Sequence, residues 1–168
     1  MSRQHYKTTT YQSQSSIGYL TKRAHSLFVD LVEPLLERHG LTYAQFIVLK
    51  LLREGVAVNP KDICLQFRHD SGALTRVIDQ LAERGLVLRL RRDRDRRKVE
   101  LQLTPAGCKA TDALAPAIVA ALNLSLATFS PAEVEELSRL LTKLNTQLQS
   151  LVESQIATTG AAAAGGSS

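Results

Sequence analysis

The segment 89–98, with the sequence RLRRDRDRRK, concentrates the charge of this chain. It contains seven basic and two acidic residues, a balance of +5, and the net charge of the full 168 residues is also +5. The remainder of the chain is therefore neutral overall. A concentrated positive segment on an otherwise neutral protein is typical of a surface that binds the phosphate backbone of nucleic acid. The two aspartates, Asp93 and Asp95, can orient neighbouring arginines through charge-assisted hydrogen bonds.

Other kinds of chemistry find little support in the sequence. No nucleophile–base pair, carboxylate dyad or phosphate-cradling glycine loop is recognisable, which argues against an enzyme. The histidines lack the spacing of metal ligands, so we expect neither a metal nor another cofactor. Cys64 and Cys108 are most simply small buried hydrophobic residues, with a thiol-based redox response through either one as the alternative. Aromatic residues make up only 5% of the chain, with no Trp, which disfavours a stacking platform for single strands.

Capping signals and apolar spacing predict the elements that must position the basic segment. The expected order is a helix over 17–40, helices over 42–53, 60–67 and 71–84, strands over 86–88 and 99–103, and helices from 105 and 131. The basic segment then forms the loop of a β hairpin that directly follows a capped helix. The sequence therefore predicts a mainly α fold with a small β hairpin, in which a winged helix-turn-helix is flanked by further helices.

The outer helices carry more apolar surface than a small winged domain can bury. We therefore expect a homodimer with an N-terminal dimerisation helix at 15–40, a DNA-binding domain at 41–104, C-terminal dimerisation helices at 105–156 and a disordered tail at 157–168. The last helix repeats leucine at three-four spacing, with Leu141 near its middle. Without a leader or a membrane-spanning apolar run, the protein is expected to be cytoplasmic.

The helix 71–84 is the predicted reader of DNA. Its first turns place small or polar residues opposite the apolar face: Ser71, Gly72, Thr75 and Arg76. A helix N-terminus attracts phosphate, Thr75 can contact a base edge, and Arg76 can reach guanine or phosphate. An ordinary solvated helix face is the alternative interpretation, and the basic hairpin that follows favours DNA reading.

The segment 41–107 resembles the MarR (multiple antibiotic resistance regulator) family of winged-helix transcription factors. The resemblance rests on LTYAQFIVLKLL, on DSGALTRVIDQLAERGLV, on the wing pattern Asp95-Arg96-Arg97 and on LTPAG. It implies a homodimer on a near-palindromic double-stranded DNA operator, with the recognition helix in the major groove and the wing in the minor groove. It also implies that Arg97 is the wing contact and that Asp95 orients it. Arg94 and Arg96 are further contacts argued from charge alone.

The resemblance implies a repressor that releases DNA when a small aromatic carboxylate or phenolic effector, or an oxidant, reaches the hinge. For such an effector, Arg23 and His25 could bind the carboxylate and Tyr43 and Phe46 the aromatic ring. Surface charges and plain core residues are the competing interpretation of these four. A nonspecific or architectural DNA-binding protein without an effector is the main alternative function.

Overall fold

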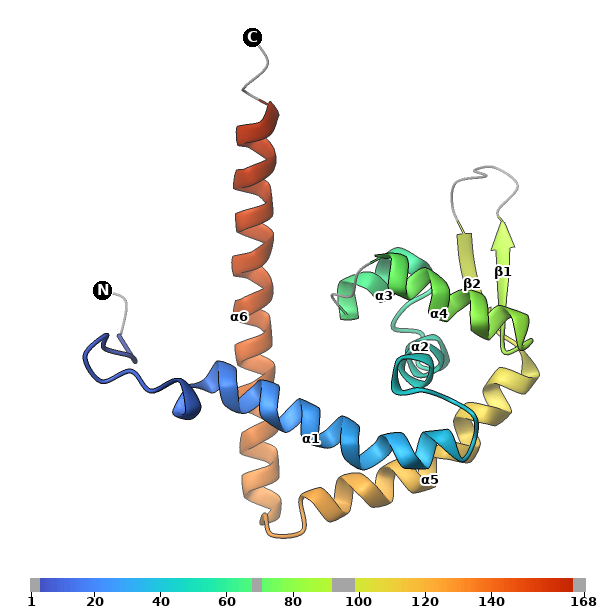
Figure 1. Cartoon of the computed structure of the whole chain (residues 1–168), viewed down its shortest axis with the longest axis horizontal. Helices are drawn as coiled ribbons and strands as arrows, with labels where there is room; N and C mark the ends of the chain where they lie inside the picture. The colour runs from blue at the N-terminus through green and yellow to red at the C-terminus, as the bar shows by residue number, and fades with distance from the viewer. Residues whose placement is uncertain (1–3, 68–70, 92–98, 165–168) are drawn as a thin grey trace. The chain divides into compact units, whose positions relative to one another are not determined.

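The computed structural model describes residues 4–67, 71–91 and 99–164 (Figure 1). It confirms a mainly helical fold with one small antiparallel hairpin. In chain order the elements are η1 (Ser13–Ser15), α1 (Ile17–Glu37), α2 (Tyr43–Arg53), α3 (Pro60–Phe67), α4 (Ser71–Glu83), β1 (Val87–Arg91), β2 (Val99–Leu103), α5 (Pro105–Ser125) and α6 (Pro131–Ala164). The chain folds as two compact units, Met1–Ala121 and Leu122–Ser168, which are described separately.

Local capping explains where the helices of the first unit begin. Thr42 and Gln45 form the predicted capping box of α2, in which each side chain accepts a hydrogen bond from the other residue's backbone N–H. Asn59 accepts a hydrogen bond from the Asp62 N–H at 2.9 Å, immediately before the proline that opens α3. Gly85, with φ of +67°, follows α4 and lets the chain turn directly into β1.

The first unit has a single apolar core to which every helix from α1 to α5 contributes. Its largest fully buried side chains are Leu36, Leu41, Leu49, Ile63, Ile78, Leu81, Leu114, Val32, Val48 and Val87. In Figure 1, α2, α3 and α4 gather at the base of the hairpin, and the two strands project away from them. The core thus holds α4 and the hairpin on one scaffold.

The hairpin pairs Val87 with Leu103 at its base and Arg91 with Val99 at its outer end. β1 is longer than the predicted strand 86–88, because it continues through Arg91 into the basic segment. The Leu101 N–H also donates to the Val58 carbonyl at 2.8 Å, which attaches the loop before α3 to β2. These bonds fix the base of the hairpin against the helical core.

The second unit contains the end of α5 and all of α6. Glu133 and Ser130 form a second capping box, with the carboxylate accepting from the Ser130 N–H at 2.8 Å. The helix then continues to Ala164. The boundary between the two compact units falls after Ala121, within α5. The predicted domain divisions, including the tail at 157–168, stay predictions. Among the described residues, no helix is both long and apolar enough to cross a membrane.

Candidate nucleic-acid interface

Helix α4 presents a polar face at its N-terminal end because its apolar residues are anchored in the core. Leu74 is 5% exposed and Ile78 is 1% exposed, whereas Gly72, Thr75 and Arg76 are exposed. Ser71 is the first residue of the helix. Gly72, Thr75 and Arg76 therefore lie together on the first turns of α4, on the side away from the core. This is the geometry needed for a helix whose end approaches a groove.

The hairpin brings the start of the basic segment beside α4. The Nη2 atom of Arg89, on β1, lies 2.6 Å from Oδ1 of Asp79, on α4. Sequence reasoning counted Arg89 with the cations of the wing, but its charge is balanced locally by this ion pair.

The wing contacts predicted from the sequence lie outside the described residues. They are Arg94, Asp95, Arg96 and Arg97, all within the segment 92–98. The described strands place the two ends of that segment at the outer end of the hairpin, after Arg91 and before Val99. The roles of the four wing residues therefore stay predictions.

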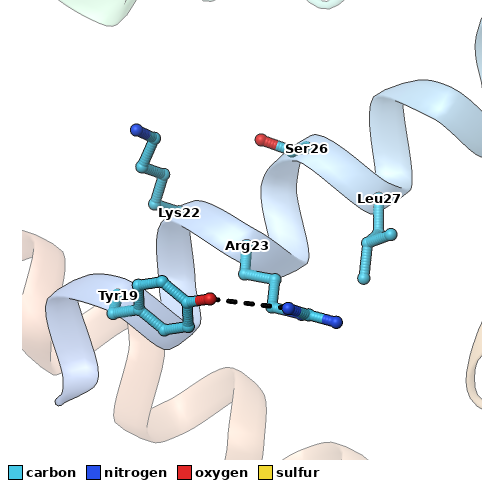
Figure 2. A pocket seen from close by; sticks show the side chains of 5 residues that line it. All are labelled: Tyr19, Lys22, Arg23, Ser26 and Leu27. Carbon is cyan, nitrogen blue, oxygen red and sulfur yellow. Dashed lines mark hydrogen bonds between the residues drawn. The ribbon is translucent and has the colours of Figure 1, made fainter. Parts of the chain in front are cut away.

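A pocket of about 380 Å³ lies along one face of α1 and is lined by Tyr19, Lys22, Arg23, Ser26 and Leu27. Within it the Arg23 guanidinium donates a hydrogen bond to the Tyr19 hydroxyl over 3.4 Å (Figure 2). Two cations, two hydroxyls and apolar atoms on one face can bind a small anion that carries a ring. All the lining residues come from α1, so the pocket is an open depression along this helix.

The four predicted effector residues do not converge on this pocket. Arg23 lines it, but His25 makes an edge contact with Tyr43, with ring centroids 5.9 Å apart. Phe46 is 6% exposed and belongs to the core. Burial raises the pKa of the Tyr43 hydroxyl above its ordinary value of 10.0.

Sequence reasoning missed Tyr19, Ser26 and Leu27 as lining residues. The signal that could have found them is the helical spacing of 19, 22, 23, 26 and 27, which places all five side chains on one face. Arg23 and His25 are two positions apart, a spacing that directs side chains to different faces of a helix.

The cysteines and acidic residues offer no competing site in the described part of the chain. Cys64 is half-buried and packs against the core, and Cys108 is half-buried at the start of α5. No group of three or more histidine, cysteine, aspartate and glutamate residues in the described ranges is arranged to hold a metal ion.

Comparison with known proteins places this geometry in a family. The MarR family profile matches residues 41–99, which run from just before the start of α2 through α3, α4 and β1 to the first residue of β2. The organic hydroperoxide resistance transcriptional regulator of Bacillus subtilis is 36% identical over 75 residues, or 45% of this chain and 51% of that protein. The HTH-type transcriptional regulator MgrA of Staphylococcus aureus is 30% identical over 110 residues, or 64% of this chain and 72% of MgrA. The chain thus spans about half the length of the Bacillus regulator and more of MgrA.

Solved structures agree with these sequence matches. BpsR of Bordetella bronchiseptica superposes with a TM-score of 0.71 and 29% identity, over 80% of this chain and 96% of BpsR. A mutant of MarR from E. coli, complexed with operator DNA, superposes with a TM-score of 0.68 and 28% identity, over 76% of this chain and 92% of MarR. The match to MgrA, together with the profile match and the shared fold, places this chain in the MarR family of transcriptional regulators, which are not enzymes.

Proposed function

We propose that this chain binds double-stranded DNA in a sequence-specific manner, with the N-terminal turns of α4 in the major groove. The main support for this proposal is that α4 has two different faces. One face is buried and contains Leu74 and Ile78, and the other is exposed and contains Gly72, Thr75 and Arg76. An α-helix fits the major groove, where base edges offer distinct patterns of donors and acceptors. The similarity to MarR solved with operator DNA supports this mode of binding.

The wing is proposed to add minor-groove and phosphate contacts through Arg94, Arg96 and Arg97, with Asp95 orienting Arg97. Support comes from the charge of the segment, because the excess positive charge of the chain lies there. Arginine inserted into a narrow minor groove meets a strongly negative potential. If about five cations of one subunit contact phosphates, the logarithm of the affinity should fall against that of salt with a slope of about −4 to −5 per subunit.

The protein is proposed to act as a homodimer that occupies the two halves of a near-palindromic operator. Helix α6 supports this proposal, because Leu137, Leu141, Leu148 and Leu151 are each 38% exposed or more within a single chain. Apolar side chains at heptad-like spacing are typical of a helix that packs against another helix. If the operator overlaps a promoter, the bound dimer would block transcription, so a repressor is proposed. Because its proposed partner is DNA, the protein is proposed to be cytoplasmic.

A small aromatic carboxylate or phenol is proposed as the effector that releases the DNA, with Arg23 as a carboxylate ligand. The α1 pocket supports this chemistry, because its lining includes Lys22, Arg23 and Tyr19, and the Arg23 guanidinium donates to the Tyr19 hydroxyl. DNA binding by the similar BpsR is regulated by 6-hydroxynicotinic acid, a compound of this class. His25 and Tyr43 lie together on another part of α1 and α2 and form a second candidate subsite.

The DNA-binding proposal can be tested by selecting duplexes from a random library with the purified full chain. We expect an enriched near-palindrome that binds at least about a thousandfold more tightly than a scrambled duplex of equal length. Equal binding of both duplexes would favour the architectural alternative instead. Arg97→Ala should weaken binding to the selected duplex about tenfold or more, without changing the melting temperature. Lys143→Ala on α6 is the control, because it also removes one positive charge, and it should leave binding nearly unchanged.

The effector proposal requires a titration of the same protein–DNA complex with a panel of aromatic carboxylates and phenols. We expect one class of compound to release the duplex from the unaltered protein, and a higher concentration of it to be needed for Arg23→Ala. A parallel titration with an organic hydroperoxide tests the redox alternative. Release by peroxide that disappears in Cys64→Ser or Cys108→Ser would replace the small-molecule effector with thiol oxidation.

A further inference from the structure

Gln45 is a polar side chain in the core of the winged domain, 6% exposed, and both ends of its amide are hydrogen-bonded. Its Oε1 accepts from the Thr42 N–H at 3.2 Å and from Nη1 of Arg84 at 3.3 Å. Because both of these partners are donors, the amide must present its Nε2 in the other direction. There Nε2 donates to Oε1 of Gln80 at 2.9 Å. The orientation of the Gln45 amide is therefore fixed by its surroundings.

The two partners beyond α2 belong to α4 and the turn after it. Gln80 lies in the last turns of α4, and Arg84 follows the helix one turn later. The Arg84 guanidinium also donates to the Gly40 carbonyl at 2.6 Å, in the turn between α1 and α2. The C-terminal half of α4 is thus joined by directed hydrogen bonds to the start of α2 and to the turn before it.

The same corner of the fold is joined to α1. The Glu33 carboxylate, on α1, accepts a hydrogen bond from the Tyr43 N–H, with both oxygens at 3.2–3.3 Å. The start of α2 is therefore hydrogen-bonded to α1 through Glu33 and to α4 through Gln45. A carboxylate at a helix N-terminus is favourable both as a hydrogen-bond acceptor and as a negative charge.

The hydrogen bonds of Gln45 and Gln80 can fix the rotation of α4 about its axis, which apolar packing alone does not fix. Leu74, Ile78 and Leu81 hold the helix against the core, but apolar contact is non-directional and tolerates small rotations about the helix axis. Hydrogen bonds weaken steeply with angle, so the contact with Gln80 selects one rotation. The rotation of α4 determines which atoms of Thr75 and Arg76 face outward.

We propose that Gln45, acting through Gln80, is a positioning residue that sets the rotation of α4 and thereby the DNA sequence preference of the protein. This inference rests on the proposed DNA-binding function. Neither residue needs to contact DNA itself. Their effect is on discrimination between sequences, because a rotated helix still carries the same positive charge to the phosphate backbone.

Gln80 is the better residue to change, since Gln45 also caps α2 and its loss would disturb that helix. Gln80 is exposed and its side chain accepts from Gln45 without capping a helix. Gln80→Glu keeps an acceptor for the Gln45 amide, whereas Gln80→Lys presents only donors and Gln80→Ala presents neither. Gln149→Ala on α6 is the matched control, because it also removes an exposed helical glutamine and one side-chain hydrogen bond, to Glu153 at 3.1 Å.

The experiment measures the ratio of affinities for two probes: the duplex selected by the unaltered full chain, and a scrambled duplex of equal length and composition. We expect Gln80→Ala and Gln80→Lys to lower this ratio about tenfold, the effect of misreading about one base pair. Gln80→Glu and Gln149→Ala should keep it. The added charge in Gln80→Lys strengthens binding to both duplexes, and the added charge in Gln80→Glu weakens binding to both. The ratio of the two affinities within one variant therefore separates positioning from electrostatics. Melting curves recorded in parallel show whether a change in stability accompanies a change in ratio.

Three results would overturn the inference. An unchanged ratio in Gln80→Lys would show that the contact does not position the helix. An equal fall in Gln80→Glu and Gln80→Lys would show that the ratio does not depend on an acceptor for the Gln45 amide. If the unaltered protein does not discriminate between the two probes, the proposed function itself fails and this inference fails with it.

Discussion

Arg89 of β1 and Asp79 of α4 form an ion pair, with Nη2 and Oδ1 2.6 Å apart. The pair joins β1 to α4, so the two elements proposed to read DNA are connected outside the apolar core. It also neutralises one arginine of the basic segment. Both side chains are more than a third exposed, so the pair is worth little in stability, and its main consequence is for the charge presented to DNA.

Releasing Arg89 should strengthen nonspecific binding. In Asp79→Asn, the guanidinium becomes available to phosphate, and the salt slope of binding to scrambled DNA should steepen by about 0.9 per subunit. Glu135→Gln, on α6, removes the same charge away from the wing and should leave the slope unchanged. Fluorescence anisotropy over a range of salt concentrations measures both. Identical slopes for the two variants would show that Arg89 does not reach phosphate when it is released.

Gly107 cannot accept a side chain without movement of the backbone around it. A Cβ atom at this position would collide with the Leu86 carbonyl oxygen, because the start of α5 passes directly over the turn into β1. Gly107→Ala should therefore destabilise the fold by about 1–3 kcal/mol. Gly18→Ala is the control, since nothing lies within 4 Å of its Cβ position and alanine favours the helix by up to about 1 kcal/mol. Thermal unfolding should show opposite shifts, and equal shifts would contradict the close packing of α5 on Leu86.

The contact between Arg53 of α2 and Asp112 of α5 predicts a pH effect. Two hydrogen bonds of 3.1 Å from the guanidinium hold the pKa of the Asp112 carboxyl below its ordinary value of 3.8. Since the folded-state pKa is the lower one, the stabilisation is complete above the unfolded pKa and is lost as the pH falls through the folded one. The melting temperature of Asp112→Asn should thus approach that of the unaltered protein at acid pH and lie below it at neutral pH. A difference that is independent of pH would contradict this account of the pair.

Leu141 is 38% exposed on α6 and is proposed to lie in the dimer seam. Leu141→Glu would bury a carboxylate between apolar helices, which is strongly unfavourable. Sedimentation should then show a shift from dimer to monomer. The control is Thr146→Glu, which places a carboxylate at another exposed position of α6 and should leave the dimer intact. A dimer that survives both substitutions would place the interface elsewhere.

Helix boundaries were the part of the fold that local sequence signals could predict. Thr42 with Gln45, and Ser130 with Glu133, formed the capping boxes that their spacing indicates. The alanines at the end of α6 have high helix propensity, which favours continuation of the helix to Ala164. Local signals of this kind act within a few residues, which is why they can be read without knowing the fold.

The contacts between elements could not be predicted in the same way. The pairing of Arg89 with Asp79 depends on how β1 returns along α4, and no periodicity relates the two positions. The contact between Gln45 and Gln80 likewise joins residues far apart in the chain. Of the predicted recognition residues, Gly72, Thr75 and Arg76 lie where helical periodicity put them. Phe46, predicted as an aromatic contact for an effector with a core role as the alternative, is 6% exposed and packs in the core.

The most direct test of the account is the affinity of the full chain for its selected duplex and for the scrambled duplex, measured over a range of salt concentrations. We predict that both affinities fall steeply as salt rises, while a large preference for the selected duplex persists throughout. A steep fall with no preference would show a protein that binds DNA only through its charge. Absence of binding to either duplex at low salt would contradict DNA recognition by α4 and the wing altogether.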